Sequence, residues 1–132
     1  DGINEMIEEL KQMNVKIAVL SNKQHIDTVT VMEKYFKDKF DYVIGKKENN
    51  RIKPHSDGII EIMNYFNIKN NNNVMFIGDS EVDVQTGINA KLKTIAVTWG
   101  FRTKDVLQGA DYFANKANEI IKIVKGINNG SN

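Results

Sequence analysis

The sequence has no cysteine, no excess of either charge and no long apolar run, and each absence excludes a class of protein. Without cysteine the 132-residue chain has neither a disulfide framework nor thiolate chemistry, and we expect a cytoplasmic protein. The 18 basic residues nearly balance the 17 acidic ones, which gives no support to binding of nucleic acid or attraction to a membrane surface. No apolar stretch approaches the roughly 18 residues of a membrane span, and no signal-peptide pattern is present.

The sequence does contain a regular alternation of helix and strand patterns, on a chain long enough to bury a core. Helices are predicted over 3–13, 25–36, 56–66 and 82–90, around 120–124, and as a short turn that Thr103 caps. Strands are predicted over 15–20, 41–44, 74–77, 94–97 and 111–113, with a frayed polar tail from Gly126. This alternation predicts an α/β fold, a Rossmann-like three-layer α/β/α arrangement around a mainly parallel sheet.

One predicted strand ends in an acidic turn. In the segment from Val74 to Asp83 the apolar run stops at Gly-Asp-Ser, and a second carboxylate follows four residues after the first. Ligands bind at the carboxyl ends of parallel strands, where the paired oxygens of Asp79 and Asp83 would suit Mg²⁺ beside a phosphate. A strand followed by a helix with Ser80 as N-cap explains the same residues equally well.

Two other connections carry polar groups suited to an anion. Ser21-Asn22-Lys23 follows a strand and offers a hydroxyl, an amide and a helix N-terminus to a phosphate, although a simple helix cap also fits. Lys53 precedes Pro54, the only proline, on a stiff loop that enters a helix. A solvated surface lysine would give the same pattern, so neither signal is specific alone.

Taken together, the order and spacing of these three signals resemble the haloacid dehalogenase superfamily of phosphatases over essentially the whole chain. The signals are Ser21-Asn22 after one strand, Lys53-Pro54 before a later helix, and Gly78-Asp79-Ser80-x-x-Asp83 after another. The stretches most similar to the phosphoglycolate-phosphatase subgroup are Thr86-Gly87, Asn89-Ala90, Trp99-Gly100-Phe101-Arg102 and Gly109-Ala110-Asp111.

The resemblance implies a Mg²⁺-dependent phosphatase acting on a small phosphorylated metabolite such as phosphoglycolate. It implies that Ser21 hydrogen-bonds the transferring phosphoryl group, with Asn22 beside it in the phosphate-binding loop. Lys53 would steady the nucleophile and neutralise phosphoryl charge, which agrees with the charge stabilisation that phosphoryl transfer needs. Asp79 would bind the metal, and Asp83 would support it directly or through water.

The chain departs from the family in its first motif. That motif is an Asp-x-Asp pair whose first member becomes an aspartyl-phosphate and whose second is the general acid/base. No two aspartates of this chain are spaced by two. The chain also begins with Asp1 rather than Met, so we interpret residues 1–132 as a single partial core domain without the nucleophile strand or a cap domain.

The missing strand would be the first and central strand of the family sheet, so the predicted fold is incomplete. Its neighbours, the strands that lead to Ser21 and Asp79, would then have open edges, which is an aggregation hazard. The two edges could pair directly, a second chain or a dimer could complete the sheet, or the chain is a fragment of a complete parent. We favour the fragment and expect negligible phosphatase activity from the chain alone.

Other functions fit the residues less well. A haloacid dehalogenase needs no metal. Two carboxylates as close as those expected for Asp79 and Asp83 would repel one another without a cation, which argues against this function. A regulatory module that binds phosphate or Mg²⁺ without catalysis would also lack the Asp-x-Asp pair. A receiver-type signalling domain does not fit Ser21-Asn22 at the first strand. His25 and His55 are interpreted as a first-turn helix residue and a loop residue rather than as bases.

Overall fold

A computed structural model of the chain describes residues 2–99, 104–105 and 107–130. Its order of helices and strands is α1 (Ile3–Gln12), β1 (Ala18–Gln24), α2 (His25–Phe36), β2 (Tyr42–Lys46), α3 (Asp57–Tyr65), the 3₁₀ turn η1 (Asn71–Asn73), β3 (Met75–Gly78), α4 (Glu81–Ala90), β4 (Lys93–Val97), β5 (Tyr112–Ala114) and α5 (Ala117–Gly130). This order confirms the predicted α/β fold. None of the described helices is long and apolar enough to cross a membrane.

Most predicted elements agree with the structure to within one or two residues, and β1 is the main exception. It begins at Ala18 rather than Val15, because Ile17 hydrogen-bonds to Asp41, the residue just before β2, and not to a residue within a strand. The backbone N–H of Ile17 donates to the Asp41 carboxylate at 2.7 Å, and the N–H of Asp41 donates to the Ile17 carbonyl. Regular pairing with β2 covers only the first three residues of β1, and an irregularity follows before Gln24 pairs with Lys46.

The predicted fraying from Gly126 is wrong, because α5 continues to Gly130. A Cβ at Gly126 would meet no atom within 4 Å, so this glycine lies on an open side of the helix. One exposed glycine costs a helix only about 1 kcal/mol relative to alanine, which does not end a helix that is already formed. The predicted cap Thr103 and the loop residues 100–102 lie outside the described residues.

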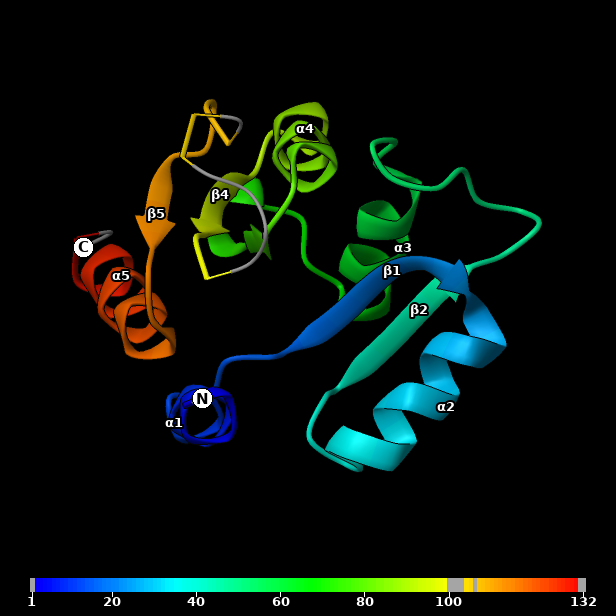
Figure 1. Cartoon of the computed structure of the whole chain (residues 1–132), viewed down its shortest axis with the longest axis horizontal. Helices are drawn as coiled ribbons and strands as arrows, with labels where there is room; N and C mark the ends of the chain where they lie inside the picture. Colours follow the sequence, from blue (N-terminus) through cyan, green and yellow to red (C-terminus); the bar gives the residue numbers. More distant parts are fainter. Residues whose placement is uncertain (1, 100–103, 106, 131–132) are drawn as a thin grey trace.

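The strands form two separate parallel sheets within the described part of the chain. The first pairs β1 with β2, and the second has the order β3-β4-β5. In Figure 1 the ribbon pair β1–β2 stands apart from the strands of the second sheet, and no strand lies between them. We call the first sheet with α2 and α3 the two-stranded half, and the second with α1, α4 and α5 the three-stranded half.

The three-stranded half contains most of the buried core. Side chains alternate along β4, so that Ile95 and Val97 face one side of the sheet and Ala96 faces the other. The first pair packs with Ala114 and Ile120 under α5, whereas Ala96 packs with Val84 of α4 and with Leu107. Helices α4 and α5 therefore cover opposite faces of this sheet, and α1 packs against α5.

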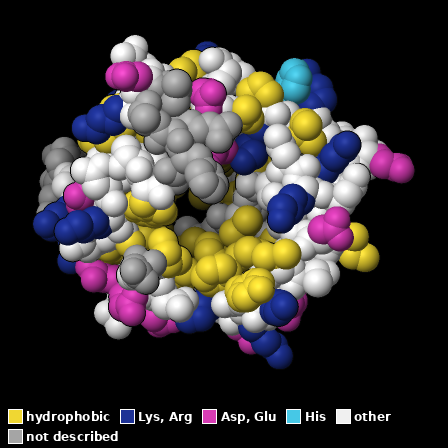
Figure 2. Space-filling model, viewed as in Figure 1, with side chains coloured by type: hydrophobic (Ala, Val, Ile, Leu, Met, Phe, Trp, Pro, Cys, Tyr) yellow, Lys and Arg dark blue, Asp and Glu magenta, His cyan; other side chains and the backbone are white. Residues whose placement is uncertain are grey.

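The two-stranded half has a smaller core. Helix α2 packs on β1 and β2, and α3 packs on β1 from the other side (Figure 1). Among the described residues of this half, the buried apolar side chains are Ile44 and Ile59, and the buried side chain of α2 is Thr28. Figure 2 shows a hollow near the middle of the molecule with apolar side chains around it, where the two halves face each other.

Candidate active site

The acidic turn after β3 forms a tightly bonded N-terminus for α4. Ser80 has an extended backbone and its hydroxyl accepts a hydrogen bond from the N–H of Asp83, so it caps the helix. One carboxylate oxygen of Asp83 accepts from the N–H of Asp79 at 3.1 Å and from the Ser80 hydroxyl at 3.2 Å. The capped helix that the sequence pattern allowed is thus present in the structure, and the Asp83 carboxylate bonds back to the backbone of Asp79.

Gly78 allows Asp83 to fold back over the end of β3. A Cβ at this glycine would overlap the Cβ and the carboxylate of Asp83. No larger residue fits while Asp83 keeps its place, so the glycine before the acidic turn is required by a close approach. Asp83 itself is 7% exposed.

Lys53 reaches the acidic turn from a loop 30 residues earlier in the chain. Its Nζ lies 2.7 Å from the other oxygen of Asp83, and the two side chains are 14% and 10% exposed. An ammonium group and a carboxylate this far from water need each other, because either charge alone would be costly to bury. Lys53 is therefore not the solvated surface lysine that its sequence position would equally allow.

Asn22 joins the same group through the backbone of Lys53. Its Oδ1 accepts from the Lys53 N–H at 2.9 Å, and its Nδ2 donates to the Lys53 carbonyl at 3.3 Å. Ser21, the preceding residue, is half-buried, and its hydroxyl accepts from the N–H of Lys23 at 3.1 Å. A continuous chain of contacts thus links the end of β1, through Lys53 and Asp83, to the backbone of Asp79.

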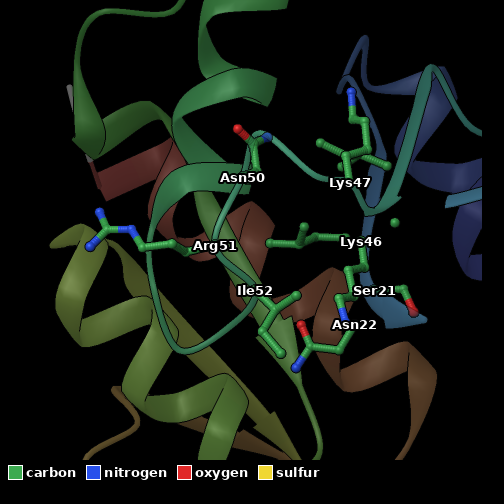
Figure 3. Close-up of a pocket in the computed structure, with 11 residues that line it drawn as sticks. Ser21, Asn22, Lys46, Lys47, Asn50, Arg51 and Ile52 are labelled. Carbon is green, nitrogen blue, oxygen red and sulfur yellow. The ribbon is translucent and has the colours of Figure 1, made fainter. Parts of the chain in front are cut away.

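A small pocket opens beside the end of β1. Figure 3 shows Ser21, Asn22 and Ile52 close together at one side of this pocket, whereas the charged ends of Lys47 and Arg51 point away from them. Both cations have carboxylate partners on α3: Lys47 lies 2.8 Å from Glu61, and Arg51 lies 2.9 Å from Asp57. The loop cations therefore anchor the loop to α3 instead of entering the pocket.

Glu61 is the centre of this anchor, and sequence reasoning did not identify it. It accepts hydrogen bonds from Lys47, from Asn50 at 2.7 Å and from the hydroxyl of Tyr42 at 2.7 Å. Burial acts to raise the pKa of Glu61, but these three donors outweigh it and hold the pKa below its usual value. The hydrogen bond to Glu61, with burial, raises the pKa of Tyr42 to about 12. The partners are 11 to 19 residues apart, so no local pattern could reveal them.

Asp79 is the carboxylate best placed to meet a metal. It is exposed at the end of β3, while both oxygens of Asp83 already accept hydrogen bonds. Within the described residues no three acidic, histidine or cysteine side chains come together as a metal cluster. The exposed carboxylate of Asp79 is thus available to a hard cation such as Mg²⁺, whereas Asp83 is engaged by Lys53 and by the turn itself.

His25 has a structural contact at the same end of the sheet. Its Nδ1 accepts a hydrogen bond from the N–H of Gly45 at 3.0 Å, which joins the start of α2 to β2. A Cβ at Gly45 would overlap Thr28 and the backbone of His25, so the contact also depends on this glycine. For His55 the structure gives a backbone hydrogen bond to Ile52.

Comparison with known proteins places the chain in a family. The sequence model of haloacid dehalogenase-like hydrolases matches residues 1–97. Pyrophosphatase PpaX of Bacillus mycoides (strain KBAB4) is 28% identical over an alignment of 132 positions that covers 97% of this chain and 60% of that protein.

Solved structures agree with the sequence match. A provisionally assigned phosphoglycolate phosphatase from Lactobacillus delbrueckii subsp. bulgaricus has a TM-score of 0.89 and 34% identity, covering 93% of this chain and 52% of its own. A predicted phosphatase from Clostridium acetobutylicum has a TM-score of 0.85 and 28% identity, covering 96% of this chain and 59% of its own. The chain spans between 52% and 60% of the length of these three proteins. Its sequence and its fold both show that it belongs to the haloacid dehalogenase-like hydrolase family.

Proposed function

We propose that this chain supplies the phosphate-binding and metal-binding part of a Mg²⁺-dependent phosphatase site. The observation that carries the proposal is the contact between Lys53 and Asp83, which joins the end of β1 to the acidic turn after β3. It places a cation, a hydroxyl-bearing loop and an exposed carboxylate at one end of the parallel strands, where α/β folds bind ligands. The chain is then a partial core domain, residues 1–132, without a cap.

The proposed roles follow from the chemistry of each side chain. The hydroxyl of Ser21 donates to a phosphoryl oxygen, and the Lys53 ammonium neutralises the charge that spreads over the equatorial oxygens. Asn22 acts by holding the backbone of Lys53. Asp79, with Asp83 behind it, would hold a Mg²⁺ ion, which would supply further charge neutralisation on the phosphoryl group. The nucleophile would be an aspartate outside this chain, since no Asp-x-Asp pair is present.

The proposed substrate is a small phosphomonoester of the phosphoglycolate type. The solved structure with 34% identity supports this choice, because its provisional name is phosphoglycolate phosphatase. The curated relative PpaX is named a pyrophosphatase, which makes pyrophosphate the second candidate. Both substrates present the same terminal phosphoryl group to Ser21, Lys53 and the metal.

Binding of inorganic phosphate to the 132-residue chain tests the proposal without requiring turnover. Calorimetry should detect phosphate binding that depends on Mg²⁺. Asp79→Asn should abolish this binding, and Lys53→Met should weaken it at least roughly tenfold, as expected for loss of a charge-assisted contact. Asp38→Asn, at an exposed aspartate far along the sequence from the site, is the matched control and should bind normally.

Turnover separates the proposal from its alternatives. The chain alone should hydrolyse p-nitrophenyl phosphate negligibly, and activity that Asp79→Asn removes would contradict an external nucleophile. Absence of any phosphate binding, with or without Mg²⁺, would overturn the proposed site. Binding without activity, even in the longest form of the protein, would favour a non-catalytic module instead.

We also propose that a parallel strand completes the sheet between β1 and β3. Within the described residues β1 pairs only with β2, and β3 pairs only with β4, so each has an open edge toward the other half. Ile77 of the edge strand β3 is 39% exposed, whereas strands in complete parallel sheets are usually buried on both faces. A strand from a longer form of the protein fits better than a dimer, since each edge needs a partner running in the same direction.

Amide hydrogen exchange tests this completion. Amides of β1 and β3 that point into the open gap should exchange rapidly, while amides of β4, which is paired on both sides, should be protected. An apolar peptide of about eight residues ending in Asp-x-Asp should slow exchange in β1 and β3 together. Protection of both edges in the chain alone, with a monomeric mass by sedimentation, would show that no added strand is needed.

A further inference from the structure

The Lys53–Pro54 segment is held by asparagine side chains from two different parts of the fold. Asn22 bonds both the N–H and the carbonyl of Lys53, at 2.9 and 3.3 Å. Asn89 donates from its Nδ2 to the carbonyl of Pro54 at 2.8 Å. These contacts span 31 and 35 residues of sequence, and they add to the local backbone hydrogen bond from His55 to Ile52 that closes the turn.

The two asparagines lie in opposite halves of the molecule. Asn22 belongs to β1 in the two-stranded half, and Asn89 lies in the last turn of α4 in the three-stranded half. Proline has no N–H and cannot join a strand ladder, so its carbonyl is the one backbone hydrogen-bonding group that Pro54 offers. Its bond to Asn89 fixes the backbone directly after Lys53 to α4.

Helix α4 therefore contacts the lysine at two points. At its first turn Asp83 pairs with the Lys53 ammonium at 2.7 Å, and at its last turn Asn89 holds the adjoining backbone. The amide of Asn89 is itself oriented, because its Oδ1 accepts from the Nε2 of Gln85 one turn earlier at 2.8 Å. With the oxygen engaged on its own helix, the NH₂ group faces Pro54.

We propose that Asn89 and Asn22 are positioning residues that set where the Lys53 ammonium stands between the two halves. Neither side chain needs to touch the substrate. Their effect passes through Lys53, so the inference rests on the proposed function of that lysine in phosphate binding. A merely structural tether between helix and loop would stabilise the fold without acting on phosphate through Lys53, and this difference can be measured.

The test measures the dissociation constant for inorganic phosphate with Mg²⁺ in the 132-residue chain. Asn89→Ala should weaken binding roughly three- to tenfold, the usual effect of losing one hydrogen bond, and Asn89→Gln should restore part of it. Asn64→Ala is the matched control, an exposed asparagine in the last turn of the neighbouring helix α3, and should bind like the unaltered chain.

A double-mutant cycle with Lys53→Met identifies the route of the effect. If Asn89 acts through the lysine, Asn89→Ala should change phosphate affinity less than about twofold once Lys53 is methionine. An equal loss in both backgrounds would overturn the inference, as would an equal loss in Asn64→Ala. Asn22→Ala, which removes two hydrogen bonds, should follow the same pattern with a larger first loss.

A second readout covers the case in which the unaltered chain binds no phosphate, which would be a failure of the proposed function. Asn89→Ala should then still shift the ¹⁵N–¹H signals of the Lys53 and Asp83 amides, and Asn22→Ala should speed hydrogen exchange at the Lys53 amide. Unchanged Lys53 and Asp83 signals in both variants would overturn the positioning inference on its own.

Discussion

The two halves of the molecule are stabilised by different kinds of contact. In the three-stranded half, β4 is buried on both faces, and fully enclosed side chains such as Ile95 and Ala96 pack under α5 and α4. In the two-stranded half, the apolar residues of β1 are only half-buried, and much of the order comes from polar and aromatic contacts around Glu61 and Tyr42. One half is closed by apolar packing, and the other still has an open side.

This difference shows that an apolar strand is not buried by its composition alone. Val19 and Leu20 in β1 are as apolar as Ile95 and Val97 in β4, yet only the second pair is buried. The difference is that β4 has a paired strand on each side, whereas β1 has one paired strand. Burial of the first pair would need the partner strand that we propose. Mutations in matched positions of the two halves should therefore have unequal effects on the free energy of unfolding.

The largest contrast is expected between two helical glycines. A Cβ at Gly87 of α4 would overlap the side chain of Thr94, which is 1% exposed and enclosed. A Cβ at Gly58 of α3 would meet the end of Leu20, a flexible and half-buried side chain. Gly87→Ala should destabilise the chain by about 2–3 kcal/mol, whereas Gly58→Ala should be nearly neutral, because better helix propensity offsets a small shift.

Urea unfolding followed by circular dichroism measures both variants. If Leu20 were packed as firmly as Thr94, both substitutions would lower the free energy of unfolding equally. Equal losses would therefore contradict an open two-stranded half. Adding the strand-completing peptide sharpens the comparison, since closing the gap should make Gly58→Ala more costly than it is in the chain alone.

A second contrast uses the same substitution in two strands. Val97→Ala in β4 removes buried methyl groups from beneath α5 and should cost about 2 kcal/mol. Val19→Ala in β1 should cost less than about 1 kcal/mol, because the side chain remains partly in water. Chemical denaturation gives both values. A loss at Val19 as large as that at Val97 would mean that β1 is already covered.

The sequence predicted the fold well because its signals are local. Helix periodicity, apolar runs and turn residues gave all five strands and the main helices, and α2 was predicted with its observed ends. The start of β1 was missed because a distant contact decides it, the hydrogen bond between Ile17 and Asp41. The end of α5 was missed because one exposed glycine at position 126 costs too little to end the helix. The family resemblance predicted a missing central strand but left open whether β1 and β3 pair directly, and only the structure shows two separate sheets in the described residues.

The site was predictable in its members but not in its connections. Ser21, Asn22, Lys53 and the acidic turn could be found because each follows a strand or precedes a helix in a recognisable order. That Asn22 bonds the Lys53 backbone, and that Asn89 bonds Pro54, depends on residues more than 30 positions apart. No spacing rule connects residues at that separation, so these contacts required the structure.

The Tyr42–Glu61 pair should make the stability of the two-stranded half depend on pH. The pKa of Tyr42 is raised to about 12 from 10.0. The contribution of its hydrogen bond to the free energy of unfolding is therefore present below pH 10 and is lost as the pH rises from 10 to 12. We expect a loss of about 1–2 kcal/mol, less than a full two-unit shift implies, because the site is only partly buried. The pKa of Glu61 is lowered, so its contribution is lost as the pH falls below about 4.5.

Thermal unfolding between pH 9 and pH 12 checks the alkaline limb. Tyr42→Phe should flatten this part of the curve relative to the unaltered chain, while Tyr35→Phe, at a tyrosine that is 62% exposed, should leave it unchanged. Other effects of alkaline pH are common to all three proteins, so only the difference between the two variants reports on Tyr42. Identical curves for both would show that the hydrogen bond to Glu61 does not hold the tyrosine proton.

The smallest effect is expected from the ion pair between α1 and α5. Glu9 and Lys125 lie 3.1 Å apart, and their side chains are about half exposed. Water and salt screen such a pair, and both side chains lose rotamer freedom when they meet, so Glu9→Gln should cost no more than about 0.5 kcal/mol at low salt. In 1 M NaCl the unfolding midpoints of the two proteins should coincide. A loss that persists at high salt would mean that Glu9 joins the two helices through packing or hydrogen bonding that salt does not screen, and not through its charge.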